Sequence, residues 1–191
     1  MEPLRTDPVL AEVIDTYGPL SLEPTDDPFV QLVVSIIEQQ LSTASANAIR
    51  ERVFARFEIA PEVLIDVDAT ELNDLGVSHR KIEYIQDAAQ AFMENDFTRD
   101  SFEEMTDQEV IEKLTTIHGV GVWTAKMFLM FSLGREDVFP LEDLGIRNGM
   151  IKLYGECTRK EMIEVAEQWR PYRSIAALYI WQYYEDTPIK D

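Results

Sequence analysis

Residues that cap α-helices stand directly before segments of helical periodicity at many points in the sequence. They include Asp7, Asp27, Ser42, Ser78 and Thr106. Proline follows Asp7 and Asp27 at the first helical position, where its fixed φ suits a helix and its missing N–H is not needed. No segment alternates apolar and polar residues around a hairpin turn, as paired β-strands would require. We therefore predict an all-α fold of about ten helices with short connections.

One helical segment is far more apolar than a surface helix would be. Residues 28–40, "PFVQLVVSIIEQQ", carry apolar side chains on nearly all sides. A surface helix shows a single apolar stripe instead. We therefore expect this segment to form a buried central helix, around which a chain of 191 residues can build one large domain or two small lobes.

The charge balance is strongly acidic. The chain holds 36 acidic and 17 basic residues, for a net charge of −19. Such a surface repels nucleic acid, so the charge alone argues against a nucleic-acid partner. Proteins that work in concentrated salt are also acidic, and molar salt shortens the Debye length to roughly 3 Å. We interpret the charge as a sign of a high-salt cytoplasm and draw no conclusion from it about the partner.

Several classes of site and location are excluded by composition. The single Cys157 cannot form an internal disulfide or supply the ligands of a cysteine-bound iron–sulfur cluster. Together with the distant His79 and His118 it offers no zinc-binding pattern. The apolar runs are too short to cross a bilayer, and the N-terminus lacks the pattern of a signal peptide. We expect a cytoplasmic protein that has no membrane partner and requires no cofactor.

A glycine-rich turn precedes one of the expected helices. Residues 115–128, "TTIHGVGVWTAKMF", hold Gly119 and Gly121, which permit positive φ and place no Cβ in the way of an approaching group. Backbone N–H groups at such a turn point outward and, with the helix dipole, can bind a phosphate without a lysine patch. An ordinary helix–turn–helix connection has the same glycine spacing, so the two glycines alone leave both interpretations open.

Four motifs follow one another over residues 28 to 184. They are "SIIEQQLSTASANAI", "LTTIHGVGVWTAKMF", "DVFPLEDLGIRNGM" and "RPYRSIAALYIWQYY". In this order and spacing they resemble the helix-hairpin-helix (HhH-GPD) DNA glycosylases, in particular the 3-methyladenine DNA glycosylase II type. The chain departs from that pattern at His118, where the family usually has proline. We expect only the compact helical core, without the extra N-terminal β-domain of the larger bacterial enzyme.

The resemblance implies a two-lobed helical fold. We expect a middle bundle at residues 29–136, which ends in the helix-hairpin-helix motif. A second lobe would combine residues 1–28 with residues 137–191, and a DNA-facing cleft would lie between the lobes. The implied partner is double-stranded DNA that contains damaged bases, bound by a monomer.

The resemblance places the catalytic aspartate at Asp143, in "LEDLGIR". Cleavage of an N-glycosidic bond develops positive charge on the sugar, which a fixed carboxylate stabilises. The same carboxylate can orient or deprotonate the attacking water. Glu142 is the adjacent rival, and Asp143 also suits the N-cap of the following helix, a role compatible with catalysis.

Trp123 bears on the type of reaction. Strand-cutting members of the superfamily carry at this position a lysine that forms a Schiff base with the sugar, which tryptophan cannot do. Lys126 lies three residues on and faces another part of the helix. We therefore expect a monofunctional glycosylase that leaves an abasic site in an unbroken strand.

The resemblance further implies a base-binding pocket, made of Trp123, Trp181 and Met127. An indole face attracts a cationic alkylated purine by roughly 0.5–2 kcal/mol. Tryptophans at helical spacing also fill protein cores, and core packing remains the alternative for both of them.

The expected DNA contacts come from two segments. Gln40, with Leu41 beside it, would fill the space that a flipped base leaves, although Gln39 and Gln40 could instead satisfy backbone groups at a helix end. The turn and the helix after it contribute Gly119, Gly121, Thr124 and Lys126. The family also implies a structural Na⁺ or K⁺ at the backbone carbonyls of Thr115, Ile117 and Val120. No catalytic metal is implied.

Three functions are compatible with these features. The first is hydrolytic removal of alkylated purines, of the 3-methyladenine and 7-methylguanine type, in base excision repair. The second is a non-catalytic helix-hairpin-helix DNA-binding module, which would need neither Asp143 nor two pocket tryptophans. The third is a glycosylase for another damaged or mismatched base; the missing lysine and cluster cysteines argue against an oxidised base.

Overall fold

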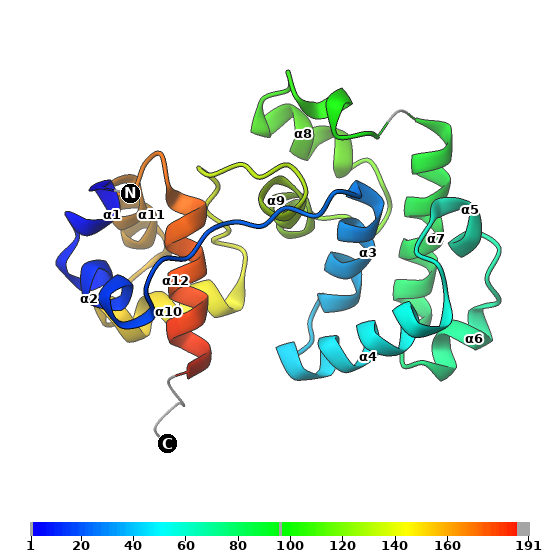
Figure 1. The fold of residues 1–191 in the computed structure, drawn as a ribbon, viewed down its shortest axis with the longest axis horizontal. Coiled ribbons are helices and arrows are strands. Elements are labelled where there is room, and N and C mark those ends of the chain that lie inside the picture. The colour runs from blue at the N-terminus through cyan, green and yellow to red at the C-terminus, as the bar shows by residue number, and fades with distance from the viewer. Residues whose placement is uncertain (1, 96, 187–191) are drawn as a thin grey trace. The chain divides into compact units, whose positions relative to one another are not determined.

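The computed structural model describes residues 2–95 and 97–186 of the 191. All regular elements among these residues are helices, twelve α-helices and one short 3-10 helix, so the predicted all-α class is confirmed (Figure 1). In chain order they are α1 (Glu2–Arg5), α2 (Pro8–Tyr17), α3 (Pro28–Glu38), α4 (Thr43–Arg56), α5 (Pro61–Leu64), α6 (Ala69–Asp74), α7 (His79–Glu94), η1 (Asp100–Phe102), α8 (Asp107–Leu114), α9 (Val122–Phe131), α10 (Leu144–Tyr154), α11 (Arg159–Glu167) and α12 (Arg173–Asp186). None of the described helices is long and apolar enough to cross a membrane.

The predicted caps are confirmed. Asp27 Oδ1 accepts hydrogen bonds from the N–H groups of Phe29 and Val30 at 2.8 and 3.2 Å, and Pro28 opens α3. Thr106 and Glu109 form the reciprocal capping box at the start of α8. Each cap satisfies N–H groups that the first helical turn leaves without partners, which explains why the helices begin at these residues.

The chain forms two compact units. One comprises Met1–Glu23 with Gly134–Asp191, and the other comprises Pro24–Leu133. The breaks fall a few residues before the boundaries expected from the sequence. The first unit contains α1, α2 and α10 to α12, and the second contains α3 to α9 (Figure 1).

In the second unit, α3 packs against α4, α7 and α9 (Figure 1). Phe29, Leu32, Val33, Ile36 and Ile37 of α3 are at most 2% exposed, which confirms the buried central helix. Burying a side chain of this size contributes roughly 1.5–3 kcal/mol of transfer free energy. The core therefore anchors α3, and with it the segment that follows its last turn.

In the first unit, α10 packs along α12. Gly149 allows this close approach, because a Cβ there would lie 2.5 Å from Ile180 Cγ2 and 3.1 Å from the Ile180 carbonyl oxygen. Buried Asp7 caps α2 and also accepts hydrogen bonds from Tyr154 Oη at 2.7 Å and Trp169 Nε1 at 3.0 Å. The close approach at Gly149 sets the packing of α10 on α12, and the bond to Asp7 holds Tyr154 at the end of α10.

Candidate functional site

Asp143 stands at the N-cap of α10, and its carboxylate is held by two donors. Oδ1 accepts hydrogen bonds from Ile146 N at 2.8 Å and from Trp181 Nε1 at 2.9 Å. Both bonds end on Oδ1, and a carboxylate has about four acceptor positions, so capping does not exhaust its capacity. The positive end of the α10 dipole lies beside this carboxylate, a favourable place for negative charge. The half-buried Asp143 is thus both a cap and an oriented anion.

Gly145 makes room for the bond between Asp143 and Trp181. A Cβ at Gly145 would lie 3.0 Å from Asp143 Oδ1 and 3.2 Å from Trp181 Cδ1. The neighbouring loop is braced by Arg147, whose guanidinium donates to the carbonyls of Leu141 and Glu142. The N–H groups of Ile146 and Trp181 thus both point at the Asp143 carboxylate, whereas the side chain of the rival Glu142 is exposed.

The hairpin between α8 and α9 uses its two glycines differently. Gly119 has φ of +84°, and a Cβ there would lie 2.0 Å from Tyr84 Cγ, so only glycine fits. Gly121 has an ordinary φ of −95°, and its Cβ position has no heavy atom within 4 Å. Gly121 is the N-cap of α9 and provides no side-chain cap, so the first N–H groups of α9 depend on other partners. A helix start with such N–H groups is able to bind a phosphate, and this role of the hairpin stays a prediction.

The segment after α3 has an unusual backbone. Gln40 has φ of +56°, the one positive φ of a non-glycine residue among the described residues. Leu41 follows with 40% of its surface exposed. The preceding Gln39 donates from Nε2 to the carbonyl of Gly119 and to Thr124 Oγ1, both at 3.0 Å. Gln39 thus satisfies a backbone group, as one alternative expected of Gln39 and Gln40, but that group belongs to the distant hairpin, and the role of Gln40 stays a prediction.

Helix α9 carries four of the predicted residues. Trp123 and Lys126 are half-buried, whereas Thr124 and Met127 are 2% and 4% exposed. Because the Thr124 hydroxyl accepts the Gln39 amide inside the unit, any DNA contact at this position would use the backbone N–H. Trp123 and Met127 lie four residues apart, on one face of the helix.

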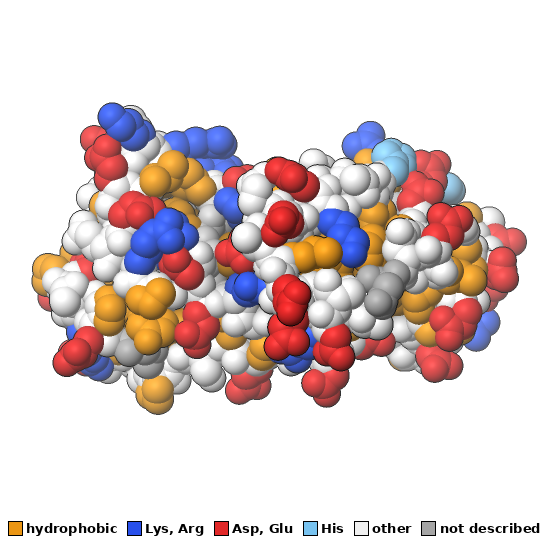
Figure 2. All heavy atoms as spheres, turned by 90° about the horizontal axis from the view of Figure 1, so that it is seen from above, with side chains coloured by type: hydrophobic (Ala, Val, Ile, Leu, Met, Phe, Trp, Pro, Cys, Tyr) orange, Lys and Arg blue, Asp and Glu red, His pale blue; other side chains and the backbone are white. Residues whose placement is uncertain are grey.

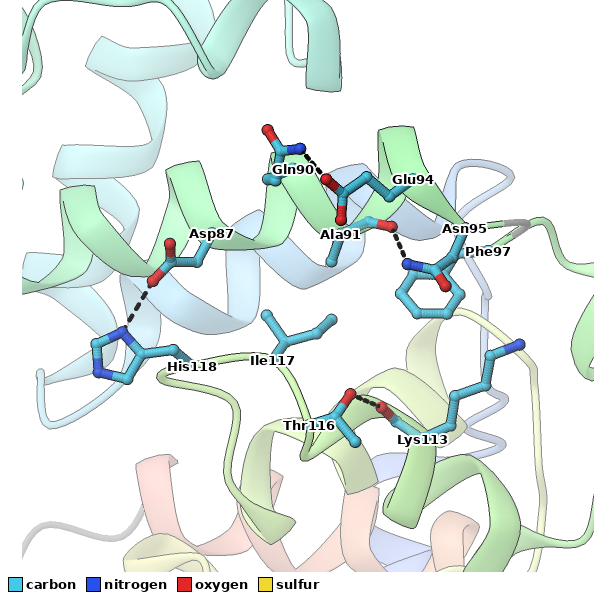
Figure 3. Close-up of a pocket in the computed structure, with 10 residues that line it drawn as sticks. All are labelled: Asp87, Gln90, Ala91, Glu94, Asn95, Phe97, Lys113, Thr116, Ile117 and His118. Carbon is cyan, nitrogen blue, oxygen red and sulfur yellow. Dashed lines mark hydrogen bonds and ion pairs between the residues drawn. The ribbon is translucent and has the colours of Figure 1, made fainter.

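His118 is bonded to α7. Its Nδ1 lies 2.8 Å from Asp87 Oδ2, and its ring meets Tyr84 edge to face at 4.9 Å. Both His118 and Asp87 line a cavity of about 360 Å³ between α7 and the α8–α9 hairpin (Figure 3). Lys113 also lines this cavity, with Nζ 4.9 Å from the centre of the Phe97 ring. At the position where the family usually has proline, His118 thus ties the turn to α7 through Asp87 and Tyr84.

The carbonyls proposed for a cation lie between α8 and α9: Thr115 is the C-cap of α8, and Ile117 and Val120 follow in the hairpin loop. Ile117 O already accepts the N–H of Val120 at 3.1 Å. A carbonyl oxygen has two lone pairs, so this bond leaves room for an ion. Thr115, Ile117 and Val120 are thus compatible with a monovalent cation, which stays a prediction.

The candidate residues thus form two groups. Asp143 and Trp181 belong to the first unit, while the Gln40-Leu41 segment, the hairpin and Trp123 belong to the second. The family resemblance implies a base contact for Trp181, but nothing in the sequence indicates that its N–H binds Asp143. On the face drawn in Figure 2, acidic side chains are widespread and lysines and arginines stand among them in small groups.

Comparison with known proteins gives concordant matches. Residues 33–172 match the family model described as "HhH-GPD superfamily base excision DNA repair protein". DNA-3-methyladenine glycosylase 1 of Schizosaccharomyces pombe is 34% identical over 185 residues, covering 91% of this chain and 79% of that protein. DNA-3-methyladenine glycosylase of Saccharomyces cerevisiae is also 34% identical over 185 residues, covering 90% of this chain and 62% of that protein.

Solved structures give the same picture. The S. pombe 3-methyladenine DNA glycosylase in complex with abasic DNA superimposes with a TM-score of 0.87 at 32% identity, covering 95% of this chain and 94% of that one. The 3-methyladenine DNA glycosylase from Archaeoglobus fulgidus has a TM-score of 0.85 at 25% identity, covering 99% of this chain and 69% of that one. The resemblance seen in the four motifs therefore extends over nearly the whole chain.

Proposed function

Because the chain belongs to the HhH-GPD superfamily of base excision DNA repair proteins, we propose that it is a DNA glycosylase for alkylated purines. Its substrates would be of the 3-methyladenine and 7-methylguanine type, which the names of the relatives support. One observation in this chain carries the proposal: the Asp143 carboxylate is held at the start of α10 by the N–H groups of Ile146 and Trp181.

The proposed reaction is hydrolysis of the N-glycosidic bond. The bond between sugar C1′ and the base nitrogen breaks, and its electrons leave with the base. The Asp143 carboxylate stabilises the positive charge that develops on the sugar. Water adds to C1′ and releases a proton to Asp143 or to solvent, and the products are a free base and an abasic site. Alkylation at N3 or N7 already gives the purine a positive charge, so its departure needs little acid catalysis.

Trp123 would recognise the cationic base through the face of its indole. Met127 lies one turn further along α9 and is 4% exposed, so it would back the indole from the core side. Trp181 would act chiefly through its N–H on Asp143, and a ring contact with the base would be secondary.

The reaction would stop at the abasic site. Strand cleavage through a Schiff base needs an amine aligned with C1′, and the family's position for that amine holds Trp123 here. Borohydride would therefore trap no covalent adduct between this protein and DNA. A trapped adduct would assign a lyase activity and overturn this part of the proposal.

The hairpin would hold a DNA phosphate through the N–H groups of the first turn of α9, which follow Gly121, while Gln40 and Leu41 would fill the gap left by the flipped base. No cofactor is needed for this hydrolysis. A Na⁺ or K⁺ at the carbonyls of Thr115, Ile117 and Val120 would brace the turn without taking part in the chemistry.

The test is base release from duplexes that carry one defined lesion, at low and at molar salt. Asp143→Asn keeps an oxygen that can accept both hydrogen bonds but removes the negative charge. We expect release to fall by about a hundredfold or more, the scale of losing one electrostatic stabiliser, with binding to an abasic-site analogue retained.

Asp27→Asn is the matched control, because Asp27 is also an N-cap that receives two amide hydrogen bonds. It should keep the wild-type rate of release. Binding of lesion duplexes by the wild-type protein without any release would identify a non-catalytic binding module. Unchanged turnover in Asp143→Asn would remove Asp143 from the reaction.

A further inference from the structure

Gln39 joins two segments that are 80 residues apart in the chain. Its Nε2 donates to the carbonyl oxygen of Gly119 and to the hydroxyl of Thr124, both at 3.0 Å. Gln39 directly follows α3, whereas Gly119 lies in the hairpin and Thr124 in the first turn of α9. One side-chain amide thus spans both sides of the candidate phosphate-binding turn.

The amide of Gln39 has few ways to move. Gln39 is half-buried, and Thr124 is 2% exposed. A donor withdrawn from this place would leave the Gly119 carbonyl and the Thr124 hydroxyl in need of new partners. The Gly119 peptide is constrained from its other side as well, because Tyr84 packs where a Cβ would be and Val120 N–H bonds to Ile117 O at 3.1 Å.

The same contact fixes the start of the exposed Gln40-Leu41 segment. Gln40 has a left-handed backbone with φ of +56°, and Leu41 is 40% exposed before Ser42 caps α4. A left-handed non-glycine residue persists only where its surroundings hold it. Gln39 stands immediately before Gln40, and its side chain is bonded to the hairpin. It therefore sets the direction in which the side chains of Gln40 and Leu41 leave α3.

Lys81 of α7 holds the end of α3, next to Gln39. Its Nζ donates to the carbonyl of Ile37, in the last turn of α3, at 2.7 Å. Partial burial lowers the pKa of the Lys81 ammonium, as expected for a cation used inside the unit. Tyr84, one turn further along α7, packs on Gly119. Helix α7 therefore supports both the end of α3 and the hairpin that Gln39 joins to it.

We propose that Gln39 is a positioning residue that couples the phosphate grip of the hairpin to the insertion of Gln40 and Leu41 into DNA. This inference rests on the proposed function, because it concerns how a damaged base is extruded. When the hairpin amides bind a phosphate, the Gln39 amide fixes where Gln40 and Leu41 meet the base stack. Without this amide the hairpin still binds DNA, but the side chains of Gln40 and Leu41 are no longer aligned with the gap that the flipped base leaves.

The test separates extrusion from simple binding. Gln39→Met preserves the length of the side chain and removes its donor. Extrusion is measured by the fluorescence of 2-aminopurine placed beside the lesion, and affinity is measured with an undamaged duplex. We expect the fluorescence change and the single-turnover rate of base release each to fall by about tenfold, the scale of losing such hydrogen bonds. Affinity for the undamaged duplex should stay within about threefold, because the hairpin amides remain.

Gln86→Met is the matched control. Gln86 is another half-buried glutamine of the second unit, and its Nε2 donates to the carbonyls of Val67 and Ile65 at 3.1 and 3.5 Å. Its substitution removes the same kind of donor away from the hairpin and should leave extrusion at the wild-type level. Thr124→Val provides a second variant, since it keeps Gln39 and removes one of its acceptors. The double variant should then lose little more than Gln39→Met alone.

Each outcome has one meaning. Wild-type protein that releases no base refutes the proposed function. The fluorescence of 2-aminopurine placed beside an abasic analogue, compared between wild type and Gln39→Met, then decides the coupling. Wild-type release together with normal extrusion in Gln39→Met refutes the coupling alone. An equal loss of undamaged-duplex affinity and extrusion would show a merely structural role and also refute it. If Gln39→Met does not fold, normal extrusion in Thr124→Val refutes the coupling, and a selective loss supports it.

Discussion

The indole N–H of Trp181 donates to Asp143 Oδ1 at 2.9 Å, across 38 residues of sequence. The backbone N–H of Ile146 donates to the same oxygen at 2.8 Å. One donor comes from the helix that Asp143 begins and the other from α12, which packs along it. The direction of the carboxylate is therefore determined by the packing of two helices together with a local cap.

Trp181→Phe should lower base release without weakening the fold much. The phenyl ring keeps most of the packing, but the donor that orients the Asp143 carboxylate is lost. We expect a decrease of about tenfold in the single-turnover rate, the scale of a hydrogen bond to a charged group. The measurement is base release at saturating enzyme, with thermal unfolding recorded in parallel.

Trp169→Phe is the control for that experiment, because Trp169 Nε1 donates to another aspartate of the same unit, Asp7 Oδ2, at 3.0 Å. Trp169 is fully buried, so its variant should lose stability while its folded fraction keeps the wild-type rate. Equal release rates in Trp181→Phe and wild type would mean that the indole N–H does not orient the reacting carboxylate.

Gly145→Ala should reduce activity through crowding alone. The added Cβ would lie 3.0 Å from Asp143 Oδ1 and 3.2 Å from Trp181 Cδ1, so the carboxylate or the indole must move. A misplacement of about 1 Å costs about a hundredfold in rate, so the smaller shift forced here should cost about tenfold. Alanine gains up to about 1 kcal/mol over glycine in a helix, and a weakened Asp143 cap costs a similar amount, so the melting temperature should change little. A variant with full activity would contradict the tight geometry described for this loop.

Gly119→Ala and Gly121→Ala should have different effects. At Gly119 the new Cβ would lie 2.0 Å from Tyr84 Cγ with φ of +84°, so the hairpin must rearrange and stability should fall by about 1–3 kcal/mol. At Gly121 the position is open and φ is −95°, so the fold should be unaffected. DNA affinity should fall in both, because a methyl group at Gly121 stands where a phosphate must approach. Urea unfolding and duplex binding would distinguish the two effects, and equal stability losses would contradict the account.

Alkaline pH should weaken the fold through Tyr154. Burial, together with the hydrogen bond to Asp7, raises the pKa of Tyr154 well above its ordinary value. The folded state thus keeps the phenol neutral, whereas the unfolded chain ionises it near pH about 10. The stability contributed by this group is complete below that pH and is lost as the pH rises further.

The measurement is urea unfolding of wild type and Tyr154→Phe at pH values below and above the ordinary phenol pKa. The variant loses the bond to Asp7, so wild type should be the more stable protein at neutral pH by about 1 kcal/mol. Its advantage should shrink in the alkaline range, where only wild type can ionise this residue on unfolding. An advantage independent of pH would show that Tyr154 does not carry this dependence.

The local features of the fold could be predicted from the sequence. Caps at Asp27, Ser42 and Thr106 begin the helices that their spacing predicts, because a cap acts on N–H groups within its own first turn. The glycine turn before α9 and the cap position of Asp143 before α10 could be predicted as well, because turns and caps depend on residues close together in the sequence. Four motifs in order were enough to indicate the family, since each motif is a contiguous stretch of chain.

The partners of these residues were decided by the tertiary structure. Nothing near Asp143 in the sequence indicates that Trp181 will donate to it, and nothing near Gln39 indicates Gly119 or Thr124. The two glycines of the hairpin look alike in the sequence, yet only Gly119 has Tyr84 against it. Local signals act through the backbone of one turn, whereas these contacts arise where separate helices pack, and side-chain spacing along one helix does not specify which residue of another helix it will meet.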